Sequence, residues 1–437
     1  MKDCGKATVI AGLAVWMAAV RAPAATLPVG PGRIYAKPSQ AAAAAHSGDI
    51  IEIDAGLYVG DVATWTAHNL TIRGVGGRAH LRADGQNAQG KGIWVITGTN
   101  TTVENIEFSG ATVPDKNGAG IRQEGSGLTV RNCYFHDNEE GILTGAGAQS
   151  EILIEYSEFA YNGYGDGQSH NMYIGNVGKF TLRYCYSHHA KIGHLVKTRA
   201  DANYILFNRL MDEMTGTVSY EVNIPQGGLS YVIGNLIEKG PASENHARII
   251  DYSSEGKKNA TQALYVANNT IVNDYGGAPT FVWFDSSAPS PTGRVVNNVF
   301  VGSGTPTNGI SAVVFTNNLT LNGAQLVSRA SYDYHLIPLS SAIDKGIAPG
   351  VFSGFDLTPL YEYVHPATNQ PRPVVGPLDI GAYECSDRDR DAMDDNWEIR
   401  YFGSINNAPP TSTVSDILGP GVTNSSGFYL IRVVRPS

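Results

Sequence analysis

The strongest constraint on the fold of this chain is a degenerate repeat of short apolar runs, each marked by an Asn or an aromatic residue. The markers lie at positions 105, 132, 156, 184, 208 and 235, so successive steps are 27, 24, 28, 24 and 27 residues. Later steps, near 33, 30 and 20 residues, are less regular. A period of about 20–30 residues is typical of a solenoid, in which each repeat forms one coil.

The residues in the repeat favour β-strands over other solenoid units. Its apolar positions hold Val, Ile, Phe and Tyr, whereas leucine-rich repeats place Leu at several fixed positions. β-Branched and aromatic side chains fit the pleated surface of stacked sheets, so the sequence predicts an all-β solenoid of parallel coils. Cys133 and Cys185 then lie two coils apart, about 10 Å, beyond the reach of a disulfide, and both are expected to be unpaired.

Both ends of a solenoid need a cap. Residues 37–48 contain five consecutive alanines before Gly48, which predicts a short N-terminal capping helix. At the other end, residues 332–344 and 379–384 are expected to close the domain. The Pro-rich stretch from Pro359 to Pro377 is expected to be poor in regular structure and to cover the last coil.

The two ends of the chain carry segments that differ from the solenoid. A basic start, a short apolar stretch and Ala22-Pro23-Ala24 have the pattern of a signal peptide over residues 1–24, which predicts a secreted protein, extracellular or periplasmic. Residues 25–385 are expected to form the solenoid domain, and residues 386–437 a small C-terminal region. No other segment is long and apolar enough to span a membrane.

The C-terminal region opens on a candidate calcium-binding loop of twelve residues, 387–398. Ca²⁺ prefers six to eight oxygen ligands, and loops of this kind supply them from fixed positions. Position 6, usually Gly because the chain turns sharply there, is Ala392. The expected ligands of this structural ion are Asp387, Asp389, Asp391, Asp395 and Glu398.

The overall charge limits the classes of partner. The formal net charge is −9, which argues against a nucleic-acid partner, because a polyanion is attracted to basic surface. A local group of cations can still bind an acidic polysaccharide. We expect the chain to be a monomer that binds such a glycan.

Side chains capable of acid, base or nucleophilic chemistry crowd into one region, where four of the eleven histidines lie within 25 residues. Val196 is expected to point inward, which turns Leu195, Lys197 and Arg199 outward. Segments one coil apart should bring their side chains together on neighbouring strands. The segments contain His170, Asn171 and Tyr173, then His194, Lys197 and Arg199, then Tyr220, Glu221 and Asn223, and one coil later Arg248 and Asp251.

This set of side chains suits removal of the proton next to a sugar carboxylate. The enolate-like intermediate carries two negative charges on one group, so an enzyme must neutralise that carboxylate with a cation. A base takes the proton, and a second group protonates the leaving oxygen in a lyase or the carbon in a C5-epimerase. The candidates are Lys197 or His194 as base, Arg199 as carboxylate clamp, and Tyr220 or His170 as proton donor. The residues expected to bind substrate are Asn171, Tyr173, His189, Lys191, Glu221, Asn223 and Arg248.

With these residues the chain resembles the right-handed parallel β-helix, pectate-lyase-like superfamily of polysaccharide lyases and epimerases. The coil pattern over residues 30–385 carries the resemblance, which implies a right-handed parallel β-helix. Lys197-Thr198-Arg199, with Asn208 further on, looks like the lysine-bearing segment of the alginate lyase and chondroitinase B group. In that group the Lys is the base, acidic residues just before it hold Ca²⁺, and an Arg one coil later assists.

The resemblance therefore implies Lys197 as the base, with two differences from the group. Residues 193–196 contain no acid, and Tyr220-Glu221 stands where the assisting Arg is expected. Neutralisation of the substrate carboxylate would then rest on Arg199 or the histidines, and no catalytic metal is assigned.

The leading hypothesis is a polysaccharide lyase that cleaves a uronate-containing chain by β-elimination. A C5-epimerase would use the same residues without cleaving the chain. The alternative from another class is a non-catalytic surface β-helix that binds glycan. Hydrolysis needs paired carboxylates, and Asp166 and Glu221 are the acids near this region, so a hydrolase is less favoured.

Overall fold

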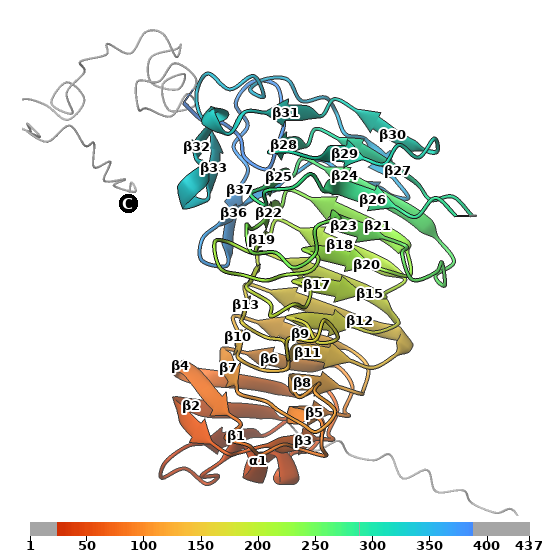
Figure 1. The fold of residues 1–437 in the computed structure, drawn as a ribbon. Helices are drawn as coiled ribbons and strands as arrows, with labels where there is room; N and C mark the ends of the chain where they lie inside the picture. Colours follow the sequence, from red (N-terminus) through yellow and green to blue (C-terminus); the bar gives the residue numbers. More distant parts are fainter. Residues whose placement is uncertain (1–23, 288, 388–437) are drawn as a thin grey trace, which may run out of the picture.

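The computed structural model of this chain describes residues 24–287 and 289–387, which form a parallel β-helix with a short helix at its N-terminal end (Figure 1). Each coil of the solenoid contributes three strands, and each strand pairs in parallel with its counterparts in the coils before and after it. The strands build three faces that run the length of the molecule. The predicted all-β solenoid is confirmed.

Face 1 is a ten-stranded sheet of the described residues. Its strands are β3 (Ala63–Trp65), β5 (Gly92–Ile96), β8 (Ala119–Gln123), β11 (Glu140–Thr144), β14 (Met172–Ile174), β17 (Val196–Thr198), β20 (Val222–Ile224), β23 (Arg248–Tyr252), β26 (Thr280–Phe284) and β29 (Thr305–Thr307).

Faces 2 and 3 are joined at the N-terminal end, because the long strand β4 pairs with both β6 and β7. Face 2 contains β1 (Thr26–Val29), β2 (Ile50–Val59), β4 (Thr71–Arg82), β6 (Thr101–Glu104), β9 (Leu128–Arg131), β12 (Gly147–Glu155), β15 (Val177–Arg183), β18 (Ala202–Leu206), β21 (Gly228–Ile233), β24 (Gln262–Ala267), β27 (Thr292–Val296) and β30 (Val313–Thr316). Face 3 continues β4 with β7 (Ile106–Ser109), β10 (Tyr134–His136), β13 (Glu158–Ala160), β16 (Tyr186–His188), β19 (Arg209–Met211), β22 (Leu236–Lys239), β25 (Thr270–Asn273), β28 (Val299–Val301) and β31 (Leu319–Leu321).

The repeat read from the sequence corresponds to the corner between faces 2 and 3. One residue per coil has a positive φ there, which turns the chain, and the residue after it points into the core. The markers at 105, 132, 156 and 184 are corner residues, but those at 208 and 235 are the inward residues that follow corners at Phe207 and Gly234. The predicted step from 184 to 208 is therefore one residue too long, because Asn occupies the corner position in some coils, as at Asn105 and Asn132, and the inward position in others, as at Asn208 and Asn235.

The inward residues after the corner form a hydrogen-bonded ladder inside the solenoid. The Oδ1 atom of Asn235 accepts from the backbone N–H and the side-chain Nδ2 of Asn208, at 2.9 and 3.0 Å. Its Nδ2 donates to the Ile205 carbonyl and to Oδ1 of Asn269, both at 2.9 Å. An amide side chain carries both donors and acceptors, so it satisfies the backbone groups left over at the turn.

Replacing Asn235 with alanine is expected to lower the free energy of unfolding by about 2–3 kcal/mol, because buried polar groups on Asn208 and Asn269 lose their partners. Urea unfolding measures this loss. Asn322, an exposed residue whose side chain caps the turn at Ala324, is the matched control and should cost under about 1 kcal/mol. Equal losses for the two variants would contradict a stabilising role for the ladder.

The core contains a stack of aromatic side chains that point inward from face 3. The rings of Phe108, Phe135 and Phe159 stack with centroids 4.9 and 4.8 Å apart, and all three are fully buried. Cys133 and Cys185 are buried and not joined in a disulfide, as predicted.

Helix α1 (Pro38–Ala44) caps the N-terminal end, as predicted. It ends at Ala44 and does not extend to Gly48, because Ala45 has extended φ and ψ. With seven residues it is far too short for a membrane span, and among the described residues no helix has the length and apolar character to cross a bilayer. After β31 come two 3₁₀ turns, η1 (Gly323–Gln325) and η2 (Arg329–Ser331), and the antiparallel pair of β32 (Leu326–Ser328) and β33 (Asp333–Leu336).

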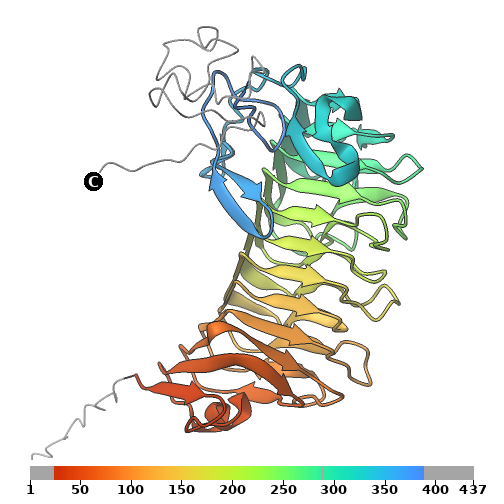
Figure 2. The ribbon, with the colours of Figure 1, turned by 90° about the vertical axis from the view of Figure 1, so that its left-hand side faces the viewer.

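The Pro-rich stretch from Pro359 to Pro377 was predicted to be poor in regular structure and to cover the last coil, and both expectations were wrong. The segment after β33 forms two antiparallel hairpins, β34 (Val351–Phe352) with β35 (Phe355–Asp356) and β36 (Tyr361–Val364) with β37 (Thr368–Pro371), which return along the side of the middle coils (Figure 2). The Tyr361 ring lies 5.6 Å from Tyr184 and 5.7 Å from Phe207. Tyr184, Phe207 and other residues along the corner form an apolar stripe. Burial of this stripe under the β36–β37 hairpin stabilises the position of the hairpin.

Candidate active site

A row of outward side chains crosses five neighbouring strands of face 1, from β14 to β26. The alternate residues of these strands point into the core. The backbone register places the row in the order Tyr173, Lys197, Asn223, Asp251 and Trp283. The segments that the sequence set one coil apart are therefore side by side, as predicted.

The expected directions hold for Val196, which lies in the core, and for Lys197 and Arg199, which lie on the outside. Leu195 was expected to point outward and is instead fully buried in the core. Strand β17 begins at Val196, so Leu195 belongs to the turn before it, where strict alternation does not apply.

Lys197 and Arg199 form a pair of cations held by one carboxylate. The ammonium of Lys197 lies 3.4 Å from Glu255, which also accepts a hydrogen bond from Arg199. Arg199 Nε donates to the hydroxyl of Tyr173 at 2.7 Å, and both cations lie 5.6 Å from the centre of the Tyr173 ring. The cations are 12% and 15% exposed, whereas Glu255 is 44% exposed, so the carboxylate closes the pair on its solvent side.

The environment of Lys197 changes its protonation. Burial lowers the pKa of Lys197, the Glu255 carboxylate opposes that shift, and Arg199 adds to it. Burial also works against the charge of Arg199, but its hydrogen bond to Glu255 and its contact with Tyr173 raise the pKa of Arg199 overall. An amine with a lowered pKa next to a permanent cation is the arrangement that a lysine base requires.

The histidines of the predicted site form a stacked ladder beside the row. The rings of His170 and His194 stack at 4.4 Å, and Tyr220 continues the ladder 5.0 Å from His194. The backbone N–H of His194 donates to Nδ1 of His170 at 3.1 Å, and that of Tyr220 donates to Nδ1 of His194 at 3.3 Å. Burial holds the pKa of both histidines well below the ordinary range, and nearby Lys197 adds to the effect. Each ring is therefore neutral, with its proton on Nε2.

The depressed pKa values of His170 and His194 should make the folded state less stable in acid. Their pKa values are depressed in the folded state, so the unfolded chain binds protons first as the pH falls below about 6.5, and stability is lost in that direction. We expect the free energy of unfolding to fall by about 1.4 kcal/mol per pH unit for each histidine below that pH. Denaturation curves over a pH series measure the slope.

The variant His194→Phe should reduce that slope, whereas His46→Ala should not, because the side chain of His46 is 90% exposed. A slope unchanged in His194→Phe would contradict the neutral buried ladder.

Two residues expected to bind substrate lie inside the solenoid, and the structure corrects those expectations. Asn171 is fully buried at the corner between faces 3 and 1, where it bonds to Asn162 and to the His188 carbonyl. Glu221 is also fully buried and pairs at 3.1 Å with the equally buried Lys239. Strand β14 begins at Met172 and β20 at Val222, so Asn171 and Glu221 lie in the turns just before these strands. Strand alternation does not apply there, and both side chains point inward.

Beyond Lys197 the row continues into a polar cluster. Asn223 is almost completely buried and donates to Asp251 at 2.8 Å, which also accepts from Ser254 and pairs with Arg248. The guanidinium of Arg248 lies 3.3 Å from the centre of the Trp283 ring. Of the predicted binding residues, Arg248 and Tyr173 are therefore partly exposed, whereas Asn223 is a buried member of the row.

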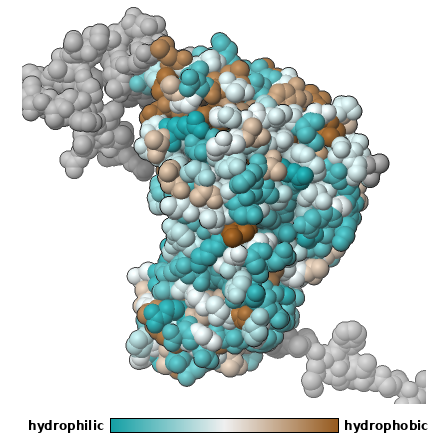
Figure 3. Space-filling view, viewed as in Figure 1, coloured by the Kyte–Doolittle hydropathy of each residue, from teal (hydrophilic) through white to brown (hydrophobic). Residues whose placement is uncertain are grey.

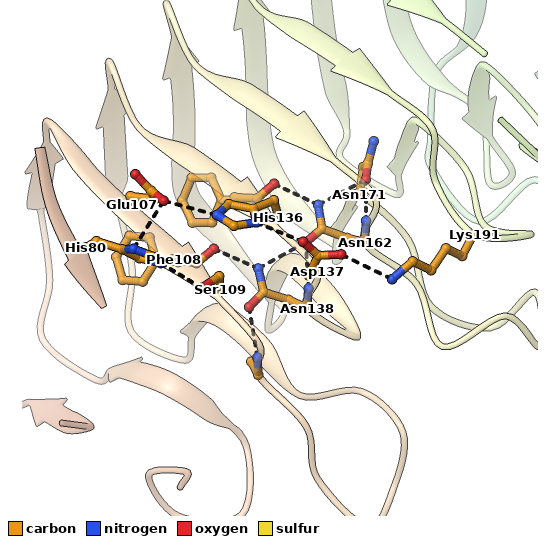
Figure 4. A network of polar contacts seen from close by, with 12 residues as sticks. His80, Glu107, Phe108, Ser109, His136, Asp137, Asn138, Asn162, Asn171 and Lys191 are labelled. Atoms are coloured by element: carbon orange, nitrogen blue, oxygen red, sulfur yellow. Dashed lines mark hydrogen bonds and ion pairs between the residues drawn. The ribbon is translucent and has the colours of Figure 1, made fainter. Parts of the chain in front are cut away.

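His189 and Lys191 belong to a different part of the surface from Lys197. The Nδ1 atoms of His188 and His189 are 2.7 Å apart at the end of β16 on face 3. The Lys191 ammonium lies 3.5 Å from Asp137, which is bonded to His136 (Figure 4). The structure therefore groups Lys191 with face 3, contrary to the prediction that it lies in the Lys197 site.

Sequence reasoning missed two features. Glu255 lies in a loop after β23, where no periodic pattern reveals which strand it contacts. His80, Glu107 and His136 come together on face 3. Each lies next to an inward residue of its strand, so the strand register could have predicted this cluster. The inward residues are Leu81, Phe108 and Phe135.

Comparison with known proteins supports the architecture. A family model described as "Right handed beta helix region" matches residues 55–235. The chain has the right-handed parallel β-helix fold. The solved structure of pectate lyase Pel9A superimposes on this β-helix with a TM-score of 0.59 at 15% sequence identity, covering 82% of this chain and 96% of that one.

Other solved structures are less similar to this chain. The PL6 family alginate lyase AlyGC matches at 13% identity with a TM-score of 0.34, over 76% of this chain and 59% of that chain. The pectin methylesterase from Aspergillus niger matches at 10% identity with a TM-score of 0.33, over 72% of this chain and 94% of that chain. Comparison with curated protein sequences gives no match. The family model and the match to pectate lyase Pel9A establish the fold, and function must be argued from the site.

Two predicted segments of the β-helix protein lie largely outside the described residues. The signal peptide is predicted over 1–24, and the description begins at Ala24. Of the predicted calcium ligands, Asp387 is described, and Asp389, Asp391, Asp395 and Glu398 lie beyond it. Both segments stay predictions.

Proposed function

We propose that this chain is a secreted polysaccharide lyase that cleaves a uronate-containing acidic polysaccharide by β-elimination on face 1. The observation that carries the proposal is the Lys197–Arg199 pair, two largely enclosed cations on the outward side of β17 and the residue that follows it. A parallel β-helix offers a long open face, which suits a polymer better than a closed pocket does. Along the middle coils the surface seen in Figure 3 is mostly hydrophilic, as a sugar-binding surface needs.

Glu255 supports the choice of an anionic substrate. Its carboxylate already bridges Lys197 and Arg199, so the geometry of the pair suits a carboxylate. A uronate carboxylate bound in the same place would receive the guanidinium charge that the enolate-like intermediate requires.

The environment of each candidate base favours Lys197 over His194. Nδ1 of His194 already accepts a backbone hydrogen bond, and its Nε2 carries the proton of the neutral ring, so that nitrogen cannot take another. Lys197 loses its proton more readily than an ordinary lysine because burial lowers its pKa.

The proposed step balances without water or a redox partner. The Lys197 amine removes the C5 proton, the electron pair forms the C4–C5 double bond, and the bond from C4 to the glycosidic oxygen breaks. The leaving oxygen takes a proton from the Tyr173 hydroxyl, which lies beside both cations. Tyr173 takes the place of the predicted donors His170 and Tyr220. The His170 ring is enclosed and Tyr220 stacks on His194, whereas the Tyr173 hydroxyl lies against Arg199 on the outward side of face 1.

Replacing Glu255 with glutamine tests the protonation of the base. Lys197 acts without its proton, so activity rises with pH through its pKa, and Glu255 raises that pKa. The variant is therefore expected to shift the acidic limb of the kcat/KM profile to lower pH. Glu151→Gln, which removes an exposed partner of Lys179 on face 2, should leave the profile unchanged. A limb that stays in place or moves to higher pH would contradict Lys197 as the base.

The experiment that tests the proposed function is a screen of the purified protein against alginate, pectate, hyaluronan, chondroitin and glucuronan. A lyase creates a double bond conjugated to the carboxylate, so ultraviolet absorbance should rise with at least one of them. Absence of any rise with the whole panel would refute the lyase. Incorporation of solvent deuterium at C5 without shortening of the chain would indicate an epimerase instead.

The proposal includes export through the predicted signal peptide at residues 1–24 and a structural Ca²⁺ in the loop 387–398. Mass spectrometry of the mature N-terminus tests the first, and titration with Ca²⁺ of Asp389→Asn against the wild type tests the second.

A further inference from the structure

Three ligand-type side chains converge on face 3, away from the Lys197 row. His80 on β4 and Glu107 on β7 are direct neighbours in the strand register, and His136 lies on β10, the next strand (Figure 4). Nδ1 of His80 lies 3.3 Å from Oε1 of Glu107, and Nε2 of His136 lies 3.1 Å from the same oxygen. One ligand atom from each residue lies within 4.8 Å of the other two.

The outer nitrogen of each ring is held by a second partner. Nε2 of His80 lies 2.7 Å from the hydroxyl of Ser109, and Nδ1 of His136 lies 2.9 Å from the carboxylate of Asp137. In the tautomers that place the N–H on these outer nitrogens, each inner nitrogen presents a lone pair. Two nitrogen lone pairs and one carboxylate then face a common point.

In those tautomers the two inner nitrogens face one carboxylate oxygen at 3.3 and 3.1 Å, an arrangement that a bound cation would stabilise.

The surroundings restrict how the three side chains move. The Tyr134 ring stacks on His136 at 4.4 Å, and Asp137 is held in turn by Lys191 at 3.5 Å. The ligating side chains are between 18% and 25% exposed, so the centre is partly enclosed yet reachable from solvent.

We infer that His80, Glu107 and His136 bind a divalent transition-metal ion of the zinc class. Imidazole nitrogens select such ions over Ca²⁺ and Mg²⁺, which prefer oxygen. Tetrahedral bonds of about 2.0–2.1 Å place ligand atoms roughly 3.4 Å apart, close to the two measured separations. Three protein ligands leave the fourth position open to water or to a group of a bound glycan, and the ion links three consecutive coils.

The test uses the untagged full-length protein with Zn²⁺ or Co²⁺ as the probe. We expect one equivalent to bind by calorimetry, Co²⁺ to give the visible absorption of a tetrahedral site with nitrogen ligands, and the thermal midpoint to rise with Zn²⁺. His80→Ala, His136→Ala and Glu107→Gln should each weaken binding at least tenfold. Asp137→Asn should weaken it by about 10–100-fold through loss of the outer hydrogen bond.

His188→Ala is the matched control. His188 also stacks on a tyrosine and lies 3.3 Å from a glutamate, Glu158, but it is not part of the converging trio. The His188→Ala variant should therefore bind the ion as tightly as the wild type does. No binding by the wild type, or binding that survives in folded His80→Ala and Glu107→Gln, would overturn the inference. Glu107→Gln keeps the size of the side chain, so loss of binding there cannot be assigned to misfolding.

Discussion

Replacing Lys197 with alanine is expected to lower kcat/KM for uronate elimination by about three orders of magnitude, the range found when a general base is removed. Lys197 faces outward between Tyr173 and Asn223, and burial lowers its pKa. Without the amine no group in the same position can take the C5 proton. Initial rates of ultraviolet absorbance on the polysaccharide that the wild type cleaves measure the loss.

Lys179→Ala is the matched control for that variant. Lys179 is 45% exposed, lies on face 2 over the Tyr204 ring and pairs with Glu151, so its removal should change kcat/KM less than twofold. The thermal midpoint of Lys197→Ala should stay close to that of the wild type, because the side chain points out of the solenoid and its ion-pair partner Glu255 is 44% exposed. A Lys197→Ala enzyme that keeps more than a tenth of the activity would rule out this lysine as the base.

The second large effect concerns the ion pair inside the solenoid. Glu221→Leu is expected to lower the free energy of unfolding by about 3–5 kcal/mol, because it leaves the ammonium of Lys239 buried without its partner. Lys239 Nζ would keep the Ser219 carbonyl at 3.2 Å as its acceptor, which does not neutralise the charge. Chemical denaturation of the purified protein measures the loss.

The double variant Glu221→Leu/Lys239→Met provides the control. It replaces both charges by apolar groups, so most of the lost stability should return, since an ion pair and a well-packed apolar pair are often equivalent in a core. Burial raises the pKa of Glu221 and the charge of Lys239 holds it down, so in the single variant Lys239→Met the carboxyl should stay protonated and neutral, and this variant should cost less than Glu221→Leu. A double variant as unstable as Glu221→Leu would contradict this account.

Much of the fold follows from the sequence because the coils repeat one inward pattern. The residues after each corner, among them Cys133, Cys185 and Asn235, occupy equivalent positions, so their spacing reveals the length of the coil. The sequence did not predict that the C-terminal hairpins return along the side of the middle coils. Tyr361 packs on Tyr184 and Phe207, and a contact between residues so far apart in the chain leaves no periodic trace.

The candidate site was predictable where it lies on strands and not where it lies in turns. The row of Tyr173, Lys197 and Asn223 follows from register alone. Asn171 and Glu221 precede their strands, where a polar side chain can turn inward to satisfy the core, so their exposure was misjudged. Glu255 was missed because it lies in a loop that folds back over face 1, and a loop has no repeating sequence pattern that shows which strand it contacts.

The mass of the products formed from a uronate oligosaccharide of defined length tests the central claim most directly. Elimination moves a proton and breaks one bond without adding water, so the masses of the two fragments should sum to the mass of the substrate, and Lys197→Ala should give no fragments. Fragments that together exceed the substrate by one water molecule would show hydrolysis. A substrate left whole by the wild type, across every acidic glycan tried, would contradict cleavage on face 1 altogether.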